Sequence, residues 1–262
     1  MMKSIFSSAI FLAIFSFSQD SLHGQDLIFP NGAKSAICLT YDDGLPSHVN
    51  TVGPALNKYG LKGTFFITVN STSLREEMGK WRGLATDGHE LANHSVYHPC
   101  RNSLPGMDWV RDFYDLDHYT VDQVLAEIQV ANGYLQALDG KKARTYAYPC
   151  AHLFAGGVSF KDSIAHVATA ARGVHDMLVP IKEIDLLNVA SYAPNGASGK
   201  DLIAYVQTVI EQKTLGTFCF HGVGAEYLSV SKEAHEELLQ WLAQHKGEVW
   251  VTTFGEATAL LK

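Results

Sequence analysis

The sequence is poor in several features that would place it in a specialised class of protein. Its 262 residues include only 8 prolines and 4 cysteines, and 20 basic residues stand against 27 acidic ones. Few prolines and 47% hydrophobic residues exclude a disordered or collagen-like chain. A net charge of −7 offers no basic surface for phosphates, which argues against binding to nucleic acid or to an anionic membrane surface. The length suits one domain of barrel size.

Long hydrophobic runs are also absent, apart from one near the start. Lys3 precedes an almost wholly apolar run over residues 5–17, and polar residues 19–21 follow it. This pattern predicts an export signal over residues 1–24, cut between residues 18 and 25, with residues 25–262 as a single domain. The run is shorter than the ~20 residues that a membrane-spanning helix requires. We therefore expect no stable membrane insertion and a periplasmic or extracellular location.

The four cysteines are too few and too dispersed for a disulfide scaffold, and none lies in a Cys-x-x-Cys pair. Cys38 and Cys219 lie in apolar runs and are expected to be small buried side chains. Cys100 and Cys150 each follow a proline, next to segments rich in polar residues. A bridge between these two segments is open to them in an oxidising compartment.

Short runs with strand character alternate with segments of helical length. The strand candidates are residues 35–40, 62–69, 89–93, 144–148, 217–221 and 248–252, and the helix candidates are residues 52–59, 74–85, 121–138, 158–170, 200–213 and 232–245. The clearest helix follows Thr120, which makes a capping box with Gln123. This alternation predicts an α/β fold with a parallel sheet, in a closed or nearly closed barrel.

Polar residues follow four of the strand candidates. They are Asp42 and Asp43 before Gly44, His94 and His98 four residues apart, Tyr148-Pro149-Cys150, and His221. Active sites of parallel barrels lie at the C-terminal ends of the strands, so we expect these residues to share one mouth. The two histidines His94 and His98 face the same way if their stretch makes one helical turn.

These residue types suit a metal-dependent hydrolase. Two imidazoles and a carboxylate form a common site for Zn²⁺ or a similar divalent ion, and Asp43, His94 and His98 can supply it. Asp42 is then left to accept a proton from the attacking water, and His221 can protonate a leaving group. Together these groups describe hydrolysis of an ester or an amide.

The motifs Thr40-Tyr41-Asp42-Asp43-Gly44, His94-Ser95-x-x-His98-Pro99, Tyr148-Pro149 and Phe220-His221-Gly222 resemble, in this order, those of the polysaccharide deacetylase family. This family has the NodB homology domain and is also called carbohydrate esterase family 4. The resemblance spans about residues 35–255. It implies a distorted (β/α)7-type barrel with parallel strands, and metal-dependent removal of acetyl groups from sugars at the C-terminal strand ends.

The resemblance also implies roles for individual residues. Asp42 corresponds to the catalytic base, His221 to the catalytic acid, and Asp43, His94 and His98 to the metal ligands. The backbone N–H of Cys150 corresponds to a donor that stabilises the oxyanion.

The implied partners are one divalent ion and an acetylated carbohydrate. Zn²⁺ is expected first, with Co²⁺, Ni²⁺ and Mn²⁺ as alternatives. Tyr148, Pro149 and His152 are expected beside the substrate. The sequence leaves open whether the acetyl group is N-linked or O-linked, and whether the sugar is xylan, chitin, peptidoglycan or another carbohydrate.

Two features depart from the family pattern. Ala147 stands where many members have an arginine that pairs with the base, and Arg144 is a candidate replacement. The segment that buttresses the acid histidine has no clean match, and Asp185 or residues 188–192 are the candidates.

Two alternatives to a carbohydrate deacetylase stay open. One is a hydrolase of the same fold that acts on a small amide or ureide, which a deep closed pocket would favour over a groove rimmed by aromatic side chains. The other is a carbohydrate-binding protein without activity, which has lost the arginine that orients the base. Residues 101–119 help to decide whether the substrate is a carbohydrate or a small amide. Their aromatic side chains either stack on sugar rings or are buried.

Overall fold

The computed structural model describes residues 27–175 and 177–262 of the chain. The predicted export signal and its cleavage site lie outside these residues. Within the described part, no helix has both the length and the apolar character needed to cross a membrane.

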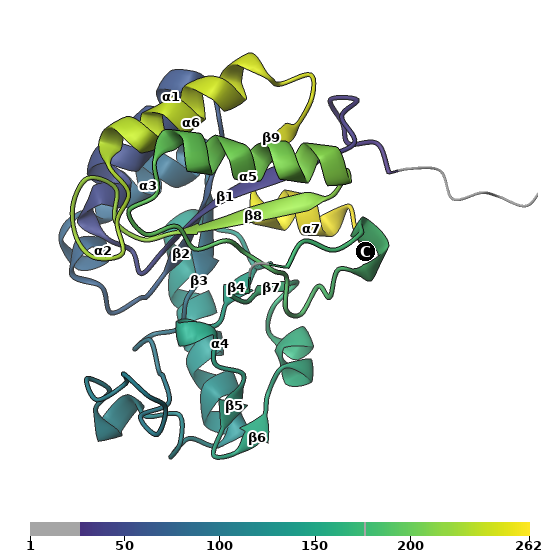
Figure 1. The fold of residues 1–262 in the computed structure, drawn as a ribbon. Helices are drawn as coiled ribbons and strands as arrows, with labels where there is room; N and C mark the ends of the chain where they lie inside the picture. Colours follow the sequence, from purple (N-terminus) through teal and green to yellow (C-terminus); the bar gives the residue numbers. More distant parts are fainter. Residues whose placement is uncertain (1–26, 176) are drawn as a thin grey trace, which may run out of the picture.

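A parallel sheet of seven strands curls around a narrow interior (Figure 1). Its order is β7-β4-β3-β2-β1-β8, and β9 pairs with the first half of β1. The strands are β1 (Ala36–Asp42), β2 (Thr64–Ile67), β3 (Glu90–Asn93), β4 (Tyr146–Ala147), β7 (Ala171–Arg172), β8 (Leu215–Phe220) and β9 (Trp250–Thr252). A separate antiparallel hairpin consists of β5 (Phe154–Ala155) and β6 (Val158–Ser159).

An irregular segment connects the two edges of the sheet. Arg172 on β7 bridges to Val189, and Tyr192 bridges to Phe218 on β8. Backbone hydrogen bonds support both contacts, from the Gly173 amide to the Val189 carbonyl (3.0 Å) and from the Tyr192 amide to the Thr217 carbonyl (2.9 Å). The curled sheet is therefore a distorted barrel of the (β/α)7 type, as the sequence predicts.

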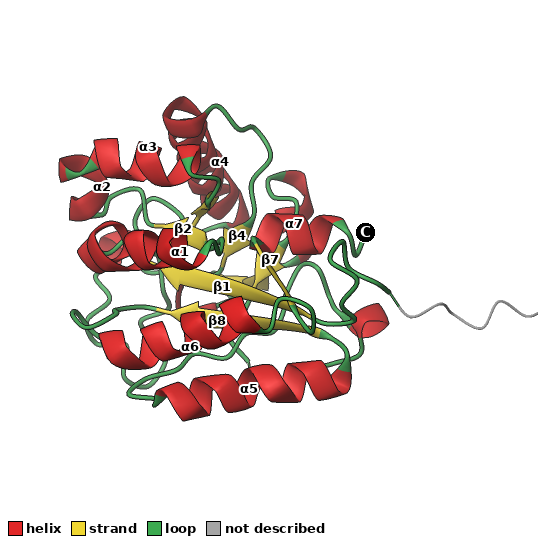
Figure 2. Cartoon of the chain, turned by 90° about the horizontal axis from the view of Figure 1, so that it is seen from above, coloured by secondary structure: helices red, strands yellow, loops and turns green. Residues whose placement is uncertain are grey.

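Helices surround the curled sheet and lie on opposite sides of it (Figure 2). They are α1 (Gly53–Tyr59), α2 (Thr72–Glu76), α3 (Met78–Thr86), α4 (Val121–Asp139), α5 (Gly199–Gln212), α6 (Lys232–Gln244) and α7 (Phe254–Ala259). A π-helical turn (His48–Val52) precedes α1, and short 3₁₀ turns span Asp112–Tyr114, Pro149–Ala151, Asp162–His166 and Ile181–Glu183.

The side chains of β1 alternate between two environments, as a strand requires. Ile37, Leu39 and Tyr41 pack in the large cluster under the helices. Ala36 and Cys38 belong to a second cluster in the barrel interior, with other small residues such as Ala92 and Ala147. Because these interior side chains are small, space remains for polar groups at the C-terminal end.

The predicted strands and most of the predicted helices are confirmed. The helix after Thr120 has the predicted capping box: the Gln123 amide donates to Thr120 Oγ1 (3.2 Å), and the Thr120 amide donates to Gln123 Oε1 (2.7 Å). The helix predicted over residues 74–85 is divided into α2 and α3, because Glu77 leaves the helical conformation.

The helix predicted over residues 158–170 is wrong. These residues form β6 and a 3₁₀ turn, and strand β7, which follows them, is absent from the predicted set. Gly156 and Gly157 both have positive φ, at 53° and 81°, and make the hairpin turn before β6. Phe160 and Ile164 are buried four residues apart, a spacing that imitates the apolar face of a helix.

Candidate active site

The end of β1 places two neighbouring carboxylates at one mouth of the barrel. Asp42 is the last residue of β1, on the interior side, and its side chain is buried. Asp43 and Gly44 follow with φ of 78° and 69°, so the chain turns sharply and Asp43 also faces the cavity. A Cβ at residue 44 would lie 2.9 Å from Ser71 Oγ and 3.0 Å from Ile67 Cγ2, so this turn requires glycine.

His94 and His98 follow β3 in an irregular loop and not in a helical turn. Ser95 and His98 both have positive φ, at 67° and 57°. The Ser95 amide donates to Asn93 Oδ1 (2.6 Å), and the His98 amide donates to Ser95 Oγ (2.9 Å), which holds this unusual path. The two imidazole rings still come together, with centroids 4.8 Å apart. The two rings thus come together through left-handed backbone conformations and not through the helical turn that the sequence predicts.

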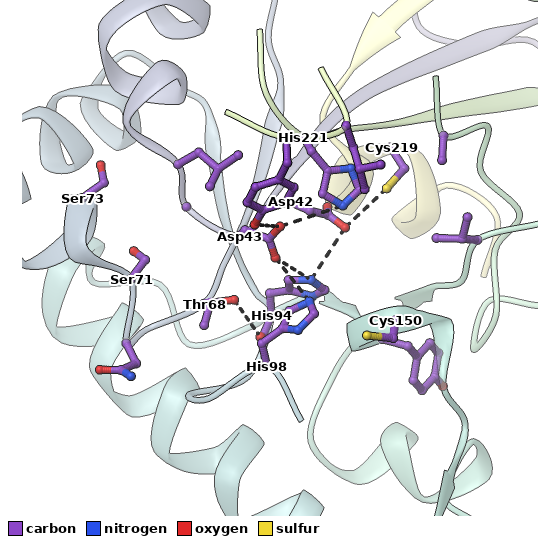
Figure 3. A pocket seen from close by; sticks show the side chains of 18 of the residues that line it. Asp42, Asp43, Thr68, Ser71, Ser73, His94, His98, Cys150, Cys219 and His221 are labelled. Atoms are coloured by element: carbon purple, nitrogen blue, oxygen red, sulfur yellow. Dashed lines mark hydrogen bonds and ion pairs between the residues drawn. The ribbon is translucent and has the colours of Figure 1, made fainter. Parts of the chain in front are cut away.

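Three of the predicted side chains offer metal-ligating atoms to a common point. The Nε2 atoms of His94 and His98 lie 3.4 Å and 3.3 Å from Asp43 Oδ1 (Figure 3). One ligating atom from each of the three residues lies within 4.8 Å of the others. His94 Nδ1 donates to the carbonyl of Ala147 (2.8 Å), which leaves Nε2 as the ring nitrogen that faces Asp43. This donor set fits a divalent cation such as Zn²⁺.

The charge states of Asp43 and His98 suit a cation site. Burial opposes ionisation of Asp43, but the hydrogen bond and charge of His94, with His98 and His221, lower its pKa. Burial also lowers the pKa of His98, to about 4, so this imidazole is neutral at physiological pH. A carboxylate and a neutral imidazole are the forms that bind metal ions.

Asp42 is paired with Arg172, which reaches it from β7. The guanidinium donates to Asp42 Oδ2, and a second nitrogen of it donates to Ser191 Oγ (3.0 Å). Burial tends to raise the pKa of Asp42, but the charges of Arg172, His94 and His221 together outweigh it and the pKa is lowered. Among the described residues, the buried Oδ1 of Asp42 has no hydrogen-bond partner. One oxygen of the carboxylate is thus held, and the other is buried without a partner among the described residues.

Arg144, the candidate replacement for the arginine at position 147, does not serve this purpose. Its guanidinium pairs with Asp139 and donates to the carbonyl of Leu91 (2.6 Å), before the start of β4. Arg172 is the arginine that pairs with the base. The sequence analysis does not identify it, because it predicts a helix over residues 158–170 and no strand after it.

The segment over residues 188–192 contributes to the site, and Asp185 does not. Ser191 accepts a hydrogen bond from Arg172 and donates one to the carbonyl of Gly173 (2.6 Å). Asp185 instead pairs with Lys161 at the surface (2.9 Å). This segment therefore supports the ion pair behind the base.

His221 follows β8 and lies across the mouth from the two histidines of the β3 loop (Figure 3). Its Nε2 is 3.9 Å from Asp43 Oδ2, and Tyr227 donates a hydrogen bond to the same oxygen (2.7 Å). The loop that carries Tyr227 is joined to the β1 loop again where the Ser47 amide donates to Glu226 Oε1 (3.1 Å). The two loops are thus held together at the mouth.

His48 also connects the same two loops, through hydrogen bonds to their backbones. The Leu45 amide donates to His48 Nδ1 (3.2 Å), so the ring proton is on Nε2, which donates to the carbonyl of His221 (3.0 Å). Burial lowers the pKa of His48, which keeps the ring neutral. His48 is therefore a structural residue, and it orients the backbone of His221.

A disulfide joins two loops of the site. Cys100, two residues after His98, is bonded to Cys150 with a Cα–Cα distance of 5.9 Å. Cys150 has φ of 53° and lines the cavity beside Tyr148. The bridge thus links the histidine loop to the loop expected to provide the oxyanion donor. Cys38 and Cys219 are free and buried, as predicted, and the thiol of Cys219 also donates to Asp42 Oδ2 (3.4 Å).

The other two residues predicted beside the substrate do not line the cavity. Pro149 is buried behind it, and His152 accepts a hydrogen bond from the Arg101 amide (3.0 Å). The cavity has a volume of about 1170 Å³. Its lining includes the polar side chains of Thr68, Ser71 and Ser73 and the exposed aromatic side chains of Trp109 and Tyr227.

The sequence pattern of the family described as "Polysaccharide deacetylase" matches residues 30–156, which contain both aspartates and both histidines of the β3 loop. Over these residues the chain has the sequence pattern of the polysaccharide deacetylase family. The region beyond residue 156, with Arg172 and His221, lies outside this match.

Solved structures share the fold. A family 4 acetyl xylan esterase from Clostridium thermocellum, in complex with a cobalt ion, has a TM-score of 0.54 at 18% identity, over 86% of this chain and 91% of that one. A mutant of a family 4 pseudoenzyme with restored enzymatic activity has a TM-score of 0.53 at 15% identity, over 87% of this chain and 68% of that one. At these identities the likeness concerns the fold.

A curated relative is the gellan lyase of a Bacillus species, 25% identical over 255 residues. The match covers 87% of this chain but only 9% of that protein. The chain therefore corresponds to a small part of that relative.

The buried pair between Asp42 and Arg172 leads to a prediction about stability. Substitution Arg172→Met leaves Asp42 buried without its counter-charge and should lower the free energy of unfolding by about 3–5 kcal/mol at pH 7. The double variant Asp42→Asn with Arg172→Met should recover part of this loss, because neither charge remains. Denaturant unfolding measures both. Equal stability of the wild type and the Arg172→Met variant would contradict a paired buried charge.

The disulfide leads to a prediction about metal binding. Replacement of both Cys100 and Cys150 by serine frees the loop of His98 and should weaken binding of Co²⁺ by about tenfold or more, by analogy with other supporting groups around metal ligands. Titration of the protein with Co²⁺, followed by visible absorption well below the unfolding temperature, measures this. Cys38→Ala, a change at a buried free thiol, is the control. Identical Co²⁺ affinity in the double serine variant would show that the bridge does not support the site.

Proposed function

We propose that the protein is an exported, metal-dependent hydrolase that removes acetyl groups from a carbohydrate. The observation that carries this proposal is the convergence of Asp43, His94 and His98 beside a second, buried carboxylate with one unpartnered oxygen. The match to the polysaccharide deacetylase family over residues 30–156 supports the reaction type and the substrate class.

Asp43, His94 and His98 would hold the ion, Zn²⁺ first, with Co²⁺, Ni²⁺ or Mn²⁺ as alternatives. When bound, a divalent ion supplies Lewis-acid polarisation of the acetyl carbonyl. Tyr227 and the two histidines keep the Asp43 carboxylate in place through hydrogen bonding and charge. His94, with Nδ1 committed to the Ala147 carbonyl, presents Nε2 toward Asp43.

Asp42 acts as the general base in this proposal. Its lowered pKa keeps the carboxylate ionised in mildly acidic solution, and Oδ1 is the oxygen that accepts the proton of the attacking water. The water oxygen bonds to the acetyl carbon, while the bond from that carbon to the sugar oxygen or nitrogen breaks. His221 gives a proton to the departing sugar, and acetate is released.

The Cys150 backbone N–H is assigned to the oxyanion that develops on the acetyl oxygen. Cys150 lines the cavity, and its positive φ turns the backbone at this point. The disulfide to Cys100 and the 3₁₀ turn Pro149–Ala151 hold this backbone in place. Only the main chain is needed here, so the side chain is free to make the bridge.

The ion pair of Arg172 removes the reason to propose a silent carbohydrate-binding protein. The absence of arginine at Ala147 would leave the base without orientation, but Arg172 provides the guanidinium from β7. A mere binding protein needs neither this buried pair nor His221. The exposed rim residues Trp109 and Tyr227 favour a carbohydrate over a small amide or ureide.

Export is part of the proposal. The apolar run over residues 5–17 after Lys3 and the disulfide between Cys100 and Cys150 both suit an oxidising compartment outside the cytoplasm.

Substitution Asp42→Asn tests the proposed function. Acetate release from acetylated xylan, chitin oligomers and peptidoglycan, with Zn²⁺ or Co²⁺ supplied, should fall by about 10²–10⁴-fold, the usual contribution of a general base. Chelation of the metal in the wild type should abolish release, and the added metal should restore it. Asp185→Asn, at an exposed carboxylate paired with Lys161, is the matched control. Undiminished release by the Asp42→Asn variant would refute the assignment.

The pH dependence of kcat/KM tests the role of Arg172 as a positioning residue. Because its charge lowers the pKa of Asp42, Arg172→Met should raise this pKa and move the acid limb of the profile to higher pH by about one unit or more. Arg172→Lys keeps the positive charge and should move the limb less. An acid limb at the same pH in the Arg172→Met variant would show that another group controls it.

A further inference from the structure

The segment over residues 101–119, between the β3 loop and α4, is held firmly although it has little regular structure. Arg101 Nε donates to Asp117 Oδ1 (2.7 Å), and the Asn102 amide donates to Asp115 Oδ1 (3.0 Å). The Leu116 amide donates to the Cys100 carbonyl (2.8 Å), next to the disulfide. Leu116 is buried, so the segment has an anchor in the core.

This fixed segment nevertheless exposes large aromatic side chains. Trp109 is 52% exposed and Phe113 is 60% exposed, and the neighbouring Tyr97 is 42% exposed. Large apolar groups held in place at the surface forgo the free energy of burial, and clusters of them mark binding sites. Of the two possibilities that the sequence leaves open for this segment, exposure holds for Trp109 and Phe113.

Ring contacts connect these side chains to the site. The ring of Trp109, which lines the cavity, has its centroid 6.4 Å from that of His98. Tyr97, the residue before His98, contacts Phe113 edge-on at 5.1 Å. Phe113 in turn contacts Tyr114 at 4.9 Å. The exposed aromatic surface therefore begins at a proposed metal ligand and continues outward from the cavity.

We propose that Trp109, Phe113 and Tyr97 form a binding platform for further sugar units of a glycan chain. One acetylated unit occupies the cavity, and neighbouring units of the same chain lie on the platform. Pyranose rings carry C–H groups on their faces, which bury apolar surface against aromatic rings. The inference rests on the proposed function and narrows its substrate to chains of several units.

The chain-length dependence of the reaction tests the platform. The wild type should gain about tenfold in kcat/KM for acetate release from acetylated oligosaccharides as they lengthen from two to six units, equal to roughly one well-placed ring contact. Phe113→Ala and Trp109→Ala should reduce this gain to less than about threefold. Phe154→Ala, at an exposed aromatic residue on β5 away from the cavity, should retain the full gain.

Calorimetry separates this inference from the proposed function. The wild type and the Phe113→Ala variant are titrated with a fully deacetylated six-unit oligosaccharide, which binds without turnover. Weaker binding by the variant supports the platform even if no acetate is released from any substrate, a result that would refute only the proposed function. Equal affinity of the two proteins, or acetate release without any gain with chain length, overturns the platform. A surface that binds another protein instead of sugar would give these same overturning results.

Discussion

The ion pair between Arg172 and Asp42 is the constraint around which the rest of the site is arranged. Both side chains are buried, and the desolvation of two charges is costly unless they are paired and hydrogen-bonded. The barrel meets this condition with Ser191 on one side of the guanidinium and the ring of Phe66 below it, 5.1 Å from the central carbon. Small interior residues such as Ala92 and Ala147 leave the required space. The pair fixes one oxygen of Asp42, and the other has no hydrogen-bond partner among the described residues.

Unusual backbone conformations bring the residues next to this buried pair to the cavity. Asp43, His98 and Cys150 all have positive φ, a conformation that costs free energy in residues other than glycine. Each is stabilised locally: by the contact of Asp43 with Tyr227, by the bond of the His98 amide to Ser95, and by the disulfide of Cys150. These loop conformations thus lower the stability of the fold, but they direct the side chains toward the site, which regular structure would not do.

The sequence predicts the parts of this protein that are encoded locally. The six strand candidates and the capped helix after Thr120 follow from hydrophobic periodicity and capping chemistry. The convergence of Asp43, His94 and His98 follows from the rule that parallel strands end at one mouth. Arg172 could not be predicted in this way, because β7 has only two residues and the partner of Arg172 lies 130 positions earlier. The sequence shows the aromatic side chains of residues 101–119 but not the part of Tyr97 in the platform. The exposure of Trp109 and Phe113 depends on anchors such as Asp115, which only the folded chain reveals.

His48 connects the site to the aromatic side chains that are packed under the helices. This ring lies between Tyr41 and Trp81, with centroids 5.8 Å and 6.3 Å away, while its Nε2 holds the backbone of His221. A change in aromatic packing under α1 and α3 would therefore be transmitted to the proposed acid without any contact to the cavity. The packing of Tyr41 and Trp81 thus bears on the position of His221, although neither side chain lines the cavity.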